Sequence, residues 1–467
     1  MGKQELHIGI VGGGIGGVMA AIAIARAGGN VTVLEAATQL GEIGAGIQMT
    51  PNVSRLLIRY GIDKAIGDDL VQFKELNLRR QDGTKTGYTL INRVEEALGF
   101  PWWLVHRHHL HEGLVKIARS NGVNLLIDSR VSDFKQQANG KVLVTTHSGK
   151  SYVFDLVVGA DGVQSITRKQ MLPKVKPKAP SGNAAYRAIV PYDEIRKDPL
   201  TRELVEDGNG NLLKTMEVWM SPAGYIITYP ISNAKDFNLV LSHFRESLAD
   251  TVKEVSVEEV RNEYKDFDPR IRRIIDKIKP PISRWPLLLT GPLESWSNPE
   301  KNIVLMGDAA HSMTNHMAQG AATSMEDGAF LARCIGAVID GRLNIADAVG
   351  VYEKGRMPKA SYKQQVSYLN GWLWHLPDGP AADARDKTMR RELQGEVPIK
   401  SANLYGDPGT VIECYGYDAE AHADDEIATW INGGKPLRDT ATSVTWKEAN
   451  KIADWFLPTE HKFKLKL

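Results

Sequence analysis

Cysteine is scarce in this chain, and neither sign of charge dominates. The 467 residues include two cysteines, Cys334 and Cys414, which are too few for a disulfide framework and fit no zinc or redox spacing. The 57 basic and 56 acidic residues leave a net charge of +1, which argues against a protein that binds nucleic acid. We therefore expect a cytoplasmic protein whose partner is a small molecule.

Long uncharged stretches are scarce as well. The clearest covers residues 8–25, and its length alone would suit a membrane span. Six glycines fall within residues 8–17, however, and such a segment would make a poor helix. We therefore expect no stable insertion into a membrane. Residues 1–5 run straight into the expected first strand, which leaves no room for a signal peptide.

These glycines instead form a nucleotide-binding motif. Residues 8–11 suit a short buried strand, and the small side chains up to residue 25 suit a helix packed on a sheet. Between them, Gly12, Gly14 and Gly17 make the pattern G-x-G-x-x-G. Gly12 permits a tight turn, Gly14 lets a pyrophosphate approach the backbone, and Gly17 lets the helix contact the strand. The motif predicts a bound dinucleotide.

A second strand supports this prediction. Residues 31–35 suit a buried strand that ends in Glu35, eighteen residues after Gly17. A carboxylate at this spacing is where the ribose 2′-hydroxyl of a dinucleotide needs an acceptor. A glycine-rich loop without a ligand would not require it.

Two later strands also end in motifs that suit a ligand. Residues 155–168 form a buried strand that continues through Gly-Ala-Asp-Gly, with the acid at Asp161, into a helix. Residues 302–311 form a strand that ends in Gly-Asp, with the acid at Asp308, and a helix follows over residues 317–339. An aspartate beside the free N–H groups of a helix start can bind ribityl hydroxyls and a pyrophosphate together.

The strand pattern changes between these motifs, which indicates a second domain. Residues 73–89 suit a hairpin, long alternating strands begin at residue 184, and residues 255–279 suit a charged helical stretch. We expect an α/β protein. Its predicted parts are a discontinuous Rossmann-type nucleotide-binding domain of residues 1–72, 101–180 and 281–360, an inserted antiparallel β-sheet domain of residues 73–100 and 181–280 that shapes the substrate site, and a mostly helical C-terminal region of residues 361–467.

Four histidines lie close together, at His106, His108, His109 and His111. His108 and His111 could share one face of a helix, as two metal ligands do. No Asp or Cys completes a ligand set nearby, and solvated polar positions explain the histidines equally well. We predict no metal site.

Taken in their order along the chain, the three motifs resemble the single-component (class A) FAD-dependent aromatic hydroxylases. The resemblance is to the salicylate hydroxylase-like group, and in particular to fungal members that act on phenolic metabolites. It extends from the first strand to about residue 360, and residues 374–380 and 415–418 resemble the fungal C-terminal extension. It implies a glutathione-reductase-like FAD-binding domain of the hydroxylase type, FAD as the bound cofactor, NADH or NADPH as a transient co-substrate, and O2.

The resemblance also implies roles for individual residues. Glu35 would hold the adenosine ribose, Gly12, Gly14 and Gly17 the pyrophosphate, and Asp308 the ribityl chain. The other implied cofactor-binding residues are Ala45 and Gly46 in the flavin-side loop, Arg107 in an Arg-x-x-Leu position, Asp161 in the Asp-Gly motif, and Gly320 and Ala321 against the isoalloxazine.

Catalytic residues are implied on the substrate side. Arg187, in Tyr-Arg-Ala, matches an arginine that faces the substrate anion in some phenol-oxidising members, and it would favour a phenolate. Tyr225, Tyr229 or His316 could relay the phenol's proton. Each of these side chains is also plausible as a core residue of the sheet.

The chain departs from the family pattern beside this site. Where the family usually carries proline, followed in many fungal members by tyrosine, this chain has Asn315 and His316. The change either alters the wall beside the reactive flavin edge or is neutral drift. Since an imidazole can accept a phenol's proton near neutral pH and return it, we expect His316 to face substrate or oxygen, with Tyr225 as the next candidate base.

The implied reaction is hydroxylation of an electron-rich aromatic small molecule, phenolic or indole-like, through a flavin C4a-hydroperoxide. We expect a monomer or homodimer. Two alternatives stay open. One is epoxidation or ring-altering oxidation of a larger natural product in secondary metabolism, and the other is a non-catalytic carrier on the same fold, such as the proteins that escort prenylated GTPases.

Overall fold

A five-stranded parallel sheet lies at the centre of the nucleotide-binding half. In the computed structural model, residues 5–41, 45–177, 183–244, 251–394, 396 and 400–433 are described. The end of the predicted C-terminal region, from residue 434 onward, lies outside them. The strands of the parallel sheet follow the order β19 (Ile303–Leu305), β12 (Leu156–Gly159), β1 (His7–Val11), β2 (Asn30–Leu34) and β8 (Asn124–Leu126).

The parallel order explains why the three motifs belong together. All pairings in this sheet are parallel, so the carboxyl ends of β1, β12 and β19 meet at one edge. Ligands bind outside the carboxyl ends of strands in open α/β sheets. Motifs that are separated by more than a hundred residues along the chain therefore face the same space.

Two helices pack on the sheet with unusually little distance between their backbones. In α1 (Ile15–Arg26) all residues from Gly17 to Ile24 are buried, and this helix lies against α12 (Gly320–Ile339). A Cβ at Gly328 of α12 would lie 2.7 Å from the Cα of Ala20 in α1. Because glycine faces alanine, the two helices approach closely and bring the starts of both to the same edge of the sheet.

Smaller elements complete this half. A three-stranded antiparallel sheet, β11-β10-β9, packs beside the parallel sheet through Phe154, Val142 and Val144. The bounds are β9 (Val131–Gln136), β10 (Val142–Thr146) and β11 (Ser151–Phe154). A second small sheet follows the order β3 (Gly46–Met49), β7 (Trp103–His106) and β4 (Val71–Gln72). The accompanying helices are α2 (Pro51–Arg59), α3 (Ile62–Ile66), α4 (Ile91–Leu98), α5 (Arg107–Ser120) and α6 (Ile166–Met171), with the short turn η1 (Gly67–Asp69).

The other half of the molecule is an eight-stranded sheet. Its order is β17 (Lys253–Val255), β18 (Ile282–Pro286), β13 (Asn183–Pro191), β16 (Asp236–Phe244), β15 (Gly224–Ile231), β14 (Thr215–Met220), β5 (Glu75–Arg80) and β6 (Lys85–Leu90). The hairpin predicted for residues 73–89 is confirmed as β5 and β6. The sheet is antiparallel except at one pair, since β5 and β14 run parallel. The hairpin is therefore a separate insertion that joins the edge of the long meander.

The helical stretch predicted for residues 255–279 is present but interrupted. It consists of two short helices, α9 (Val257–Glu263) and α10 (Pro269–Ile275). The Asp268 side chain accepts a hydrogen bond from the backbone N–H of Arg270 and so starts a new helix, and Pro269 occupies the first turn. With α7 (Tyr192–Arg196) and α8 (Pro199–Arg202), these helices cover one face of the sheet.

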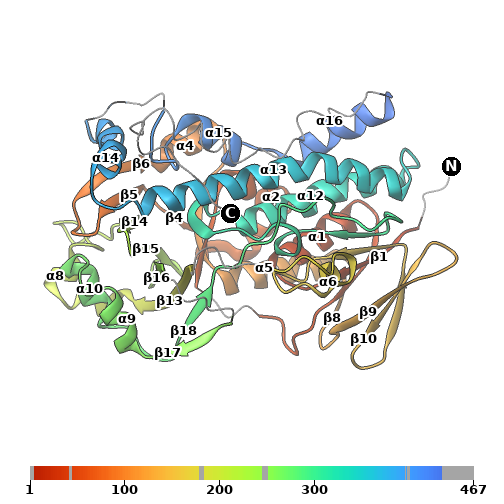
Figure 1. The fold of residues 1–467 in the computed structure, drawn as a ribbon, viewed down its shortest axis with the longest axis horizontal. Coiled ribbons are helices and arrows are strands. Elements are labelled where there is room, and N and C mark those ends of the chain that lie inside the picture. Colours follow the sequence, from red (N-terminus) through yellow and green to blue (C-terminus); the bar gives the residue numbers. More distant parts are fainter. Residues whose placement is uncertain are drawn as a thin grey trace.

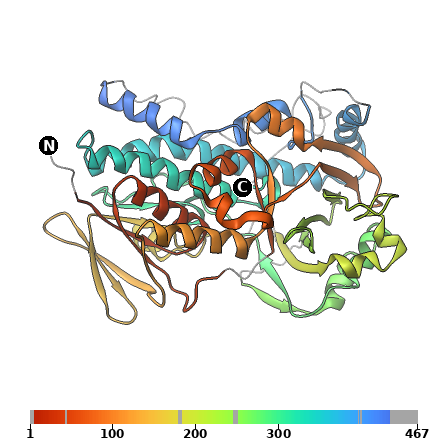
Figure 2. The same ribbon diagram turned by 180° about the vertical axis from the view of Figure 1, so that it is seen from behind.

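The long helix α13 (Ile345–Trp374) joins the two halves (Figure 1). Its first turns contribute Val349 and Tyr352 to the core of the nucleotide-binding half, and its last turns contribute Leu369 and Trp374 to the core beneath the eight-stranded sheet. Figure 2 shows α13 extending behind both halves in the reverse view. Three further helices follow it, α14 (Pro380–Leu393), α15 (Pro408–Tyr415) and α16 (Ala419–Ile431).

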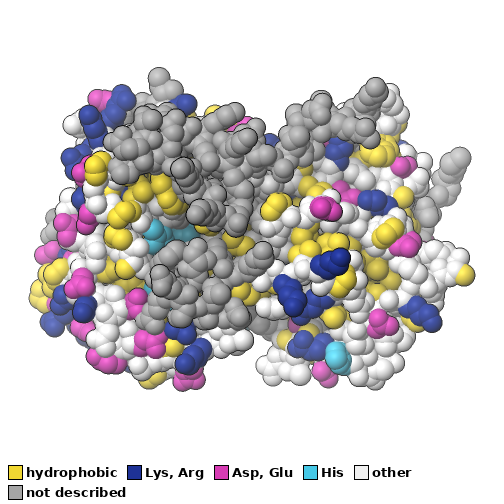
Figure 3. Space-filling view, in the orientation of Figure 1, with side chains coloured by type: hydrophobic (Ala, Val, Ile, Leu, Met, Phe, Trp, Pro, Cys, Tyr) yellow, Lys and Arg dark blue, Asp and Glu magenta, His cyan; other side chains and the backbone are white. Residues whose placement is uncertain are grey.

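Basic and acidic side chains are interspersed over both halves of the face drawn in Figure 3. Among the described residues, no helix combines the length and apolar character needed to cross a bilayer.

Candidate active site

A cavity of about 410 Å³ lies where the two halves meet. It opens between the carboxyl edge of the parallel sheet and one face of the eight-stranded sheet. Seven of the predicted cofactor-binding residues line it, namely Gly14, Gly17, Gly46, Arg107, Asp308, Gly320 and Ala321. The same cavity is lined by Arg187 from β13. The structure therefore brings the residues of the first and third motifs to one site with the predicted substrate-side arginine.

The first glycine motif has the geometry that its spacing predicts. Gly12 has φ +106°, which lies in the region that favours glycine, and its N–H donates to Leu34 O at 2.9 Å. A Cβ at Gly17 would collide with the carbonyl oxygen of Gly12. Gly12 therefore makes the turn without lining the cavity, and Gly17 allows α1 to start directly beside the strand.

Glu35 lies at the end of β2 and contacts this loop. Its carboxylate accepts hydrogen bonds from the N–H groups of Gly13, at 2.6 Å, and Ala37, at 2.7 Å. Glu35 does not line the described cavity. Its role toward ribose stays a prediction, and the structure adds that the same carboxylate fixes the glycine loop.

His111 has a role at the glycine loop that was not predicted from the sequence. Its Nε2 lies 2.7 Å from the carbonyl oxygen of Gly13, so this histidine holds the other side of the loop. The signal was present, because His111 shares a buried helix face with Leu114, Val115 and Ala118, where a polar group needs a partner. Among the described residues, no group of three or more His, Cys, Asp or Glu side chains is arranged to hold a metal ion.

Asp161 lies near the cavity but is engaged in the backbone of its own motif. Its carboxylate accepts hydrogen bonds from Ser165 Oγ, at 2.5 Å, and Thr167 N–H, at 3.0 Å, at the start of α6. It does not line the cavity, although its neighbours Ala160 and Gly162 do. The cofactor role predicted for Asp161 receives no direct support from this position.

Arg168 links the second motif to the third, which was not predicted. It is fully buried and donates to Ala309 O at 2.7 Å and to Val163 O at 2.6 Å. Burial lowers the pKa of Arg168, and the nearby carboxylates of Asp161 and Asp308 oppose that shift. The guanidinium therefore fixes the start of α11 (Asp308–His311) and places positive charge near Asp308.

The turn that presents Asp308 is held from behind. Gly307 has φ +59°, and its N–H donates to Asp327 Oδ2 at 2.9 Å. Asp327 Oδ2 also lies 2.6 Å from His311 Nε2, and Asp327 Oδ1 accepts from Arg356 Nε at 2.9 Å. Burial alone would raise the pKa of Asp327, but His311 and Arg356 lower it below its ordinary value. The ionised Asp327 thus fixes the turn on which Asp308 stands.

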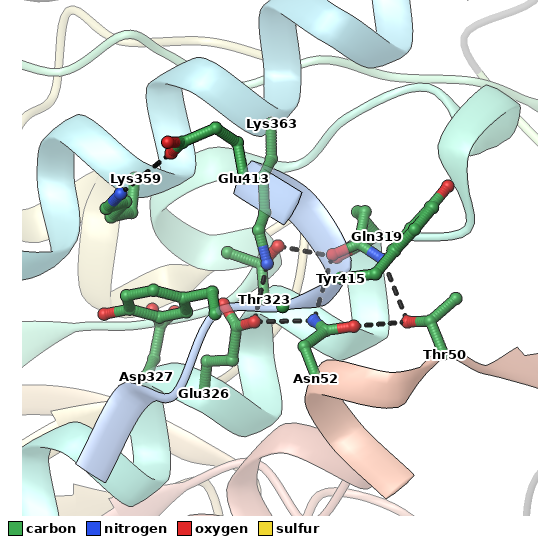
Figure 4. Close-up of polar contacts among 12 residues, drawn as sticks. Thr50, Asn52, Gln319, Thr323, Glu326, Asp327, Lys359, Lys363, Glu413 and Tyr415 are labelled. Atoms are coloured by element: carbon green, nitrogen blue, oxygen red, sulfur yellow. Dashed lines mark hydrogen bonds and ion pairs between the residues drawn. The ribbon is translucent and has the colours of Figure 1, made fainter. Parts of the chain in front are cut away.

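The start of α12 is fixed by a second buried group of polar side chains (Figure 4). Thr50 Oγ1 donates to Asn52 Oδ1 at 2.6 Å, Asn52 Nδ2 donates to Gln319 Oε1 at 3.1 Å, and Gln319 Nε2 donates to Thr50 Oγ1 at 3.0 Å. Asn52 Nδ2 also donates to Glu326 Oε1 at 2.6 Å, and Lys363 Nζ of α13 donates to that oxygen at 2.5 Å. Gln319 directly precedes the cavity-lining residues Gly320 and Ala321.

The flavin-side loop predicted at Ala45 and Gly46 leads into β3. Ala45 is buried, does not line the cavity, and accepts a hydrogen bond through its carbonyl oxygen from the N–H of Arg107 at 3.2 Å. The Gly46 N–H donates to Asn238 Oδ1 of β16 at 2.7 Å. This contact joins the loop to the eight-stranded sheet. The preceding residues 42–44 lie outside the described residues.

One face of the eight-stranded sheet forms the opposite wall. Arg187 of β13 pairs with Val240 of β16, which in turn pairs with Ile227 of β15, and all three side chains line the cavity. Tyr229 lines it as well. Burial raises the pKa of Tyr229, so its hydroxyl keeps its proton at neutral pH. Arg187 therefore stands at one end of a row of apolar side chains.

Tyr225 lies on the same face of β15 but beneath the wall. It is fully buried, and its hydroxyl donates to Asn315 Oδ1 at 2.6 Å. Burial raises the pKa of Tyr225 to about 12. Asn315, at the start of η2 (Asn315–Met317), lines the cavity, and Tyr225 does not.

His316 is turned away from the cavity, contrary to the expectation that it faces substrate or oxygen. Its side chain is 1% exposed, and its ring lies 4.9 Å from Tyr225, 5.4 Å from Trp374 and 6.0 Å from His375, measured between ring centroids. It packs on the backbone at Gly371, where a Cβ would lie 2.6 Å from the imidazole. Burial lowers the pKa of His316 well below its ordinary value, so the imidazole is neutral. Asn315 and His316 are successive residues of the 3-10 helix η2, so their side chains point in different directions, and this helix packs against α13.

The cavity fits FAD in the residues that line it. Glycine backbone at Gly14 and Gly17, beside the start of α1, suits a pyrophosphate, and Asp308 suits a polyol chain. A Cβ at Gly320 would have only Met313 within 4 Å, so the start of α12 leaves room for a flat ring. The chain supplies these elements at one edge of the sheet, as a dinucleotide requires.

Comparison with known proteins agrees with this fit. The family model described as "FAD binding domain" matches residues 5–361. The FAD-dependent monooxygenase OpS4 of Beauveria bassiana is 30% identical over 91% of this chain and 98% of that protein. The 3-hydroxybenzoate 6-hydroxylase of Klebsiella oxytoca is 32% identical over 85% of this chain and 96% of that protein. The crystal structure of CtdE in complex with FAD and substrate superposes with a TM-score of 0.76 at 20% identity, covering 92% of this chain and 99% of CtdE.

A non-catalytic carrier finds no support in the fold, in the position of the three motifs or in these relatives. The chain belongs to the FAD binding domain family and is an FAD-dependent monooxygenase of the class A aromatic hydroxylase group.

Proposed function

We propose that this enzyme hydroxylates an electron-rich aromatic small molecule, phenolic or indole-like, and that it consumes NADH or NADPH together with O2. The observation that carries the proposal is the position of Arg187, which lines the same cavity as Asp308 and Gly320. A guanidinium there favours the ionised form of a phenol, and a phenolate ring carbon is a better nucleophile than that of the neutral phenol. Bound FAD would supply the electrophilic oxygen.

The other lining residues support the same reaction. Ile227 and Val240 stand beside Arg187 on the sheet and present apolar surface to a ring. Apolar walls also exclude water, which protects a reactive oxygen from loss as hydrogen peroxide. The Klebsiella oxytoca relative is named for 3-hydroxybenzoate, which is an aromatic anion. An anionic aromatic is therefore the substrate class to test first.

The test uses the purified holoenzyme. We expect slow oxidation of NADH or NADPH alone, faster oxidation with a phenolic acid, and a hydroxylated product. Arg187→Ala should keep FAD but yield less product for each NAD(P)H consumed, and Arg187→Lys should restore part of the coupling, since a point charge replaces a planar fork. Arg284→Ala is the matched control, because Arg284 lies on the neighbouring strand β18 and pairs with Glu259 instead of lining the cavity.

Unchanged coupling in Arg187→Ala would contradict the substrate-side role of Arg187. The proposed reaction as a whole would be contradicted if no aromatic compound accelerated NAD(P)H oxidation in enzyme that is fully loaded with FAD.

A further inference from the structure

Asn315 is the polar side chain of the cavity wall that stands where the family pattern has proline. It is half-buried and lines the cavity five residues before Gly320. Its side-chain oxygen is already engaged, since Oδ1 accepts the hydroxyl of Tyr225 at 2.6 Å. The question is therefore what its side-chain nitrogen binds.

The phenol that contacts Asn315 is itself closely packed. Tyr225 is fully buried, and its ring contacts Trp374 at 5.1 Å, His375 at 5.5 Å and His316 at 4.9 Å between centroids. Its hydroxyl donates to Asn315 Oδ1 at 2.6 Å, and the raised pKa of about 12 keeps the proton needed for this bond in place at neutral pH. The histidines around it have lowered pKa values because of burial, so they place no positive charge beside the phenol.

A planar carboxamide that accepts through Oδ1 has its donor group on the other branch. Nδ2 of Asn315 has no hydrogen-bond partner among the described residues. An amide N–H without a partner is costly unless water or a ligand accepts from it. Because Tyr225 lies beneath the wall and Asn315 forms its surface, the open side of the amide is the cavity.

We propose that Asn315 is a substrate-binding residue whose side-chain N–H recognises an acceptor oxygen on the aromatic ring, and that Tyr225 is the positioning residue that sets its orientation. This inference rests on the proposed hydroxylation. It assigns a substrate that carries two oxygen functions, one held by Arg187 as an anion and a second, carbonyl or carboxylate, held by Asn315. Tyr225 thereby has a role other than proton relay.

Two matched phenols separate the second oxygen from the rest of the ring. 3-Hydroxyacetophenone carries a carbonyl where 3-ethylphenol carries a methylene group, and both bind through the same phenol. Dissociation constants for the holoenzyme are measured from the change in the flavin absorption spectrum. We expect the parent to bind the ketone with a dissociation constant about fivefold lower, which corresponds to the net free energy of one neutral hydrogen bond. Asn315→Leu should lower this preference, because it keeps a branched side chain of similar shape and removes the donor.

Tyr225→Phe tests the positioning role. It leaves the Asn315 amide free to rotate, so the preference should fall below that of the parent while 3-ethylphenol binds as before. Tyr186→Phe is the matched control, because Tyr186 is also a buried tyrosine of this sheet, its hydroxyl donates to Glu259 at 2.9 Å, and it does not line the cavity. Its preference should equal that of the parent. FAD content and unfolding midpoint are checked for every variant.

The outcomes are distinguishable. A parent that prefers neither phenol, or an Asn315→Leu variant that keeps the preference, overturns the role of Asn315 even if hydroxylation is observed. A Tyr225→Phe variant with the full preference overturns the positioning role. A parent whose flavin spectrum responds to neither phenol, and which forms no hydroxylated product, contradicts the proposed function itself.

Discussion

The buried ion pair between α12 and α13 allows a sharp prediction about stability. Lys363 Nζ lies 2.5 Å from Glu326 Oε1, and both side chains are fully buried. Glu326 also accepts from Arg356 at 2.9 Å and from Asn52 at 2.6 Å. Lys363→Met keeps the length of the side chain and removes its charge. Removing one partner of a buried ion pair lowers the free energy of unfolding by about 3–5 kcal/mol. Because two donors to Glu326 remain, we expect a decrease of about 3 kcal/mol for Lys363→Met.

The same helix supplies the matched control. Lys359, one turn earlier, lies 3.2 Å from Glu413, and these side chains are 33% and 53% exposed. Both lysines are labelled in Figure 4, where Lys359 lies beside Glu413 and Lys363 reaches toward Glu326. Because an exposed pair is worth about 0–1 kcal/mol, Lys359→Met should leave the unfolding free energy almost unchanged. The comparison therefore isolates burial from the loss of a lysine.

A double variant tests the physical reason. Glu326→Gln together with Lys363→Met removes the uncompensated charge and keeps an oxygen that accepts from Asn52. More than half of the lost stability should return, since an unpaired buried charge causes the larger part of the cost. The free energy of unfolding is measured by denaturant titration of the apoprotein with tryptophan fluorescence. FAD affinity is measured separately by titration, and Lys363→Met should weaken it more than Lys359→Met because the network fixes Gln319 beside Gly320.

Two results would refute this reasoning. Lys363→Met could prove as mild as Lys359→Met, which would mean that Glu326 does not need the ammonium group. The double variant could instead be as unstable as the sum of both single variants, in which case packing and not charge accounts for the loss.

The remaining predictions concern the cofactor and His316. Glu35→Ala and Asp308→Ala should each weaken FAD binding, measured by fluorescence titration. Neither variant should lower the unfolding midpoint of the apoprotein by more than a few degrees. If both variants bind FAD as tightly as the parent, the cofactor assignment is contradicted. His316→Phe should leave the pH profile of hydroxylation unchanged, since the imidazole does not line the cavity, and a shifted profile would restore the proton-relay hypothesis. The unfolded chain takes up a proton at His316 below its ordinary pKa of about 6.5, whereas the folded chain, with its lowered pKa, does not. Stability should therefore fall as the pH drops from 7 to 5, and His316→Phe should lose less than the parent in thermal unfolding.

The sequence determined those features that depend on neighbours along the chain. A turn and a helix start are predicted by the spacing of Gly12, Gly14 and Gly17 alone. Glu35 and Asp308 are predicted as ligand-binding residues because each is an acid at the end of a buried strand. The parallel order of the strands then brings these strand ends to one edge, because the crossover connections of such sheets allow few other arrangements. For this reason the nucleotide-binding half was predictable.

Only the tertiary structure decided which way the side chains of the substrate side point. Tyr225 and Asn315 are 90 residues apart, and Asn52 and Glu326 are 274 residues apart. No periodicity relates such pairs. From the sequence, His316 and Tyr225 could each be a catalytic residue or a core residue. In the structure η2 packs against α13, both side chains are buried beneath the cavity wall, and Asn315 lines the cavity. The choice follows from burial of whole elements against one another, which is a property of the assembled fold and not of any local pattern.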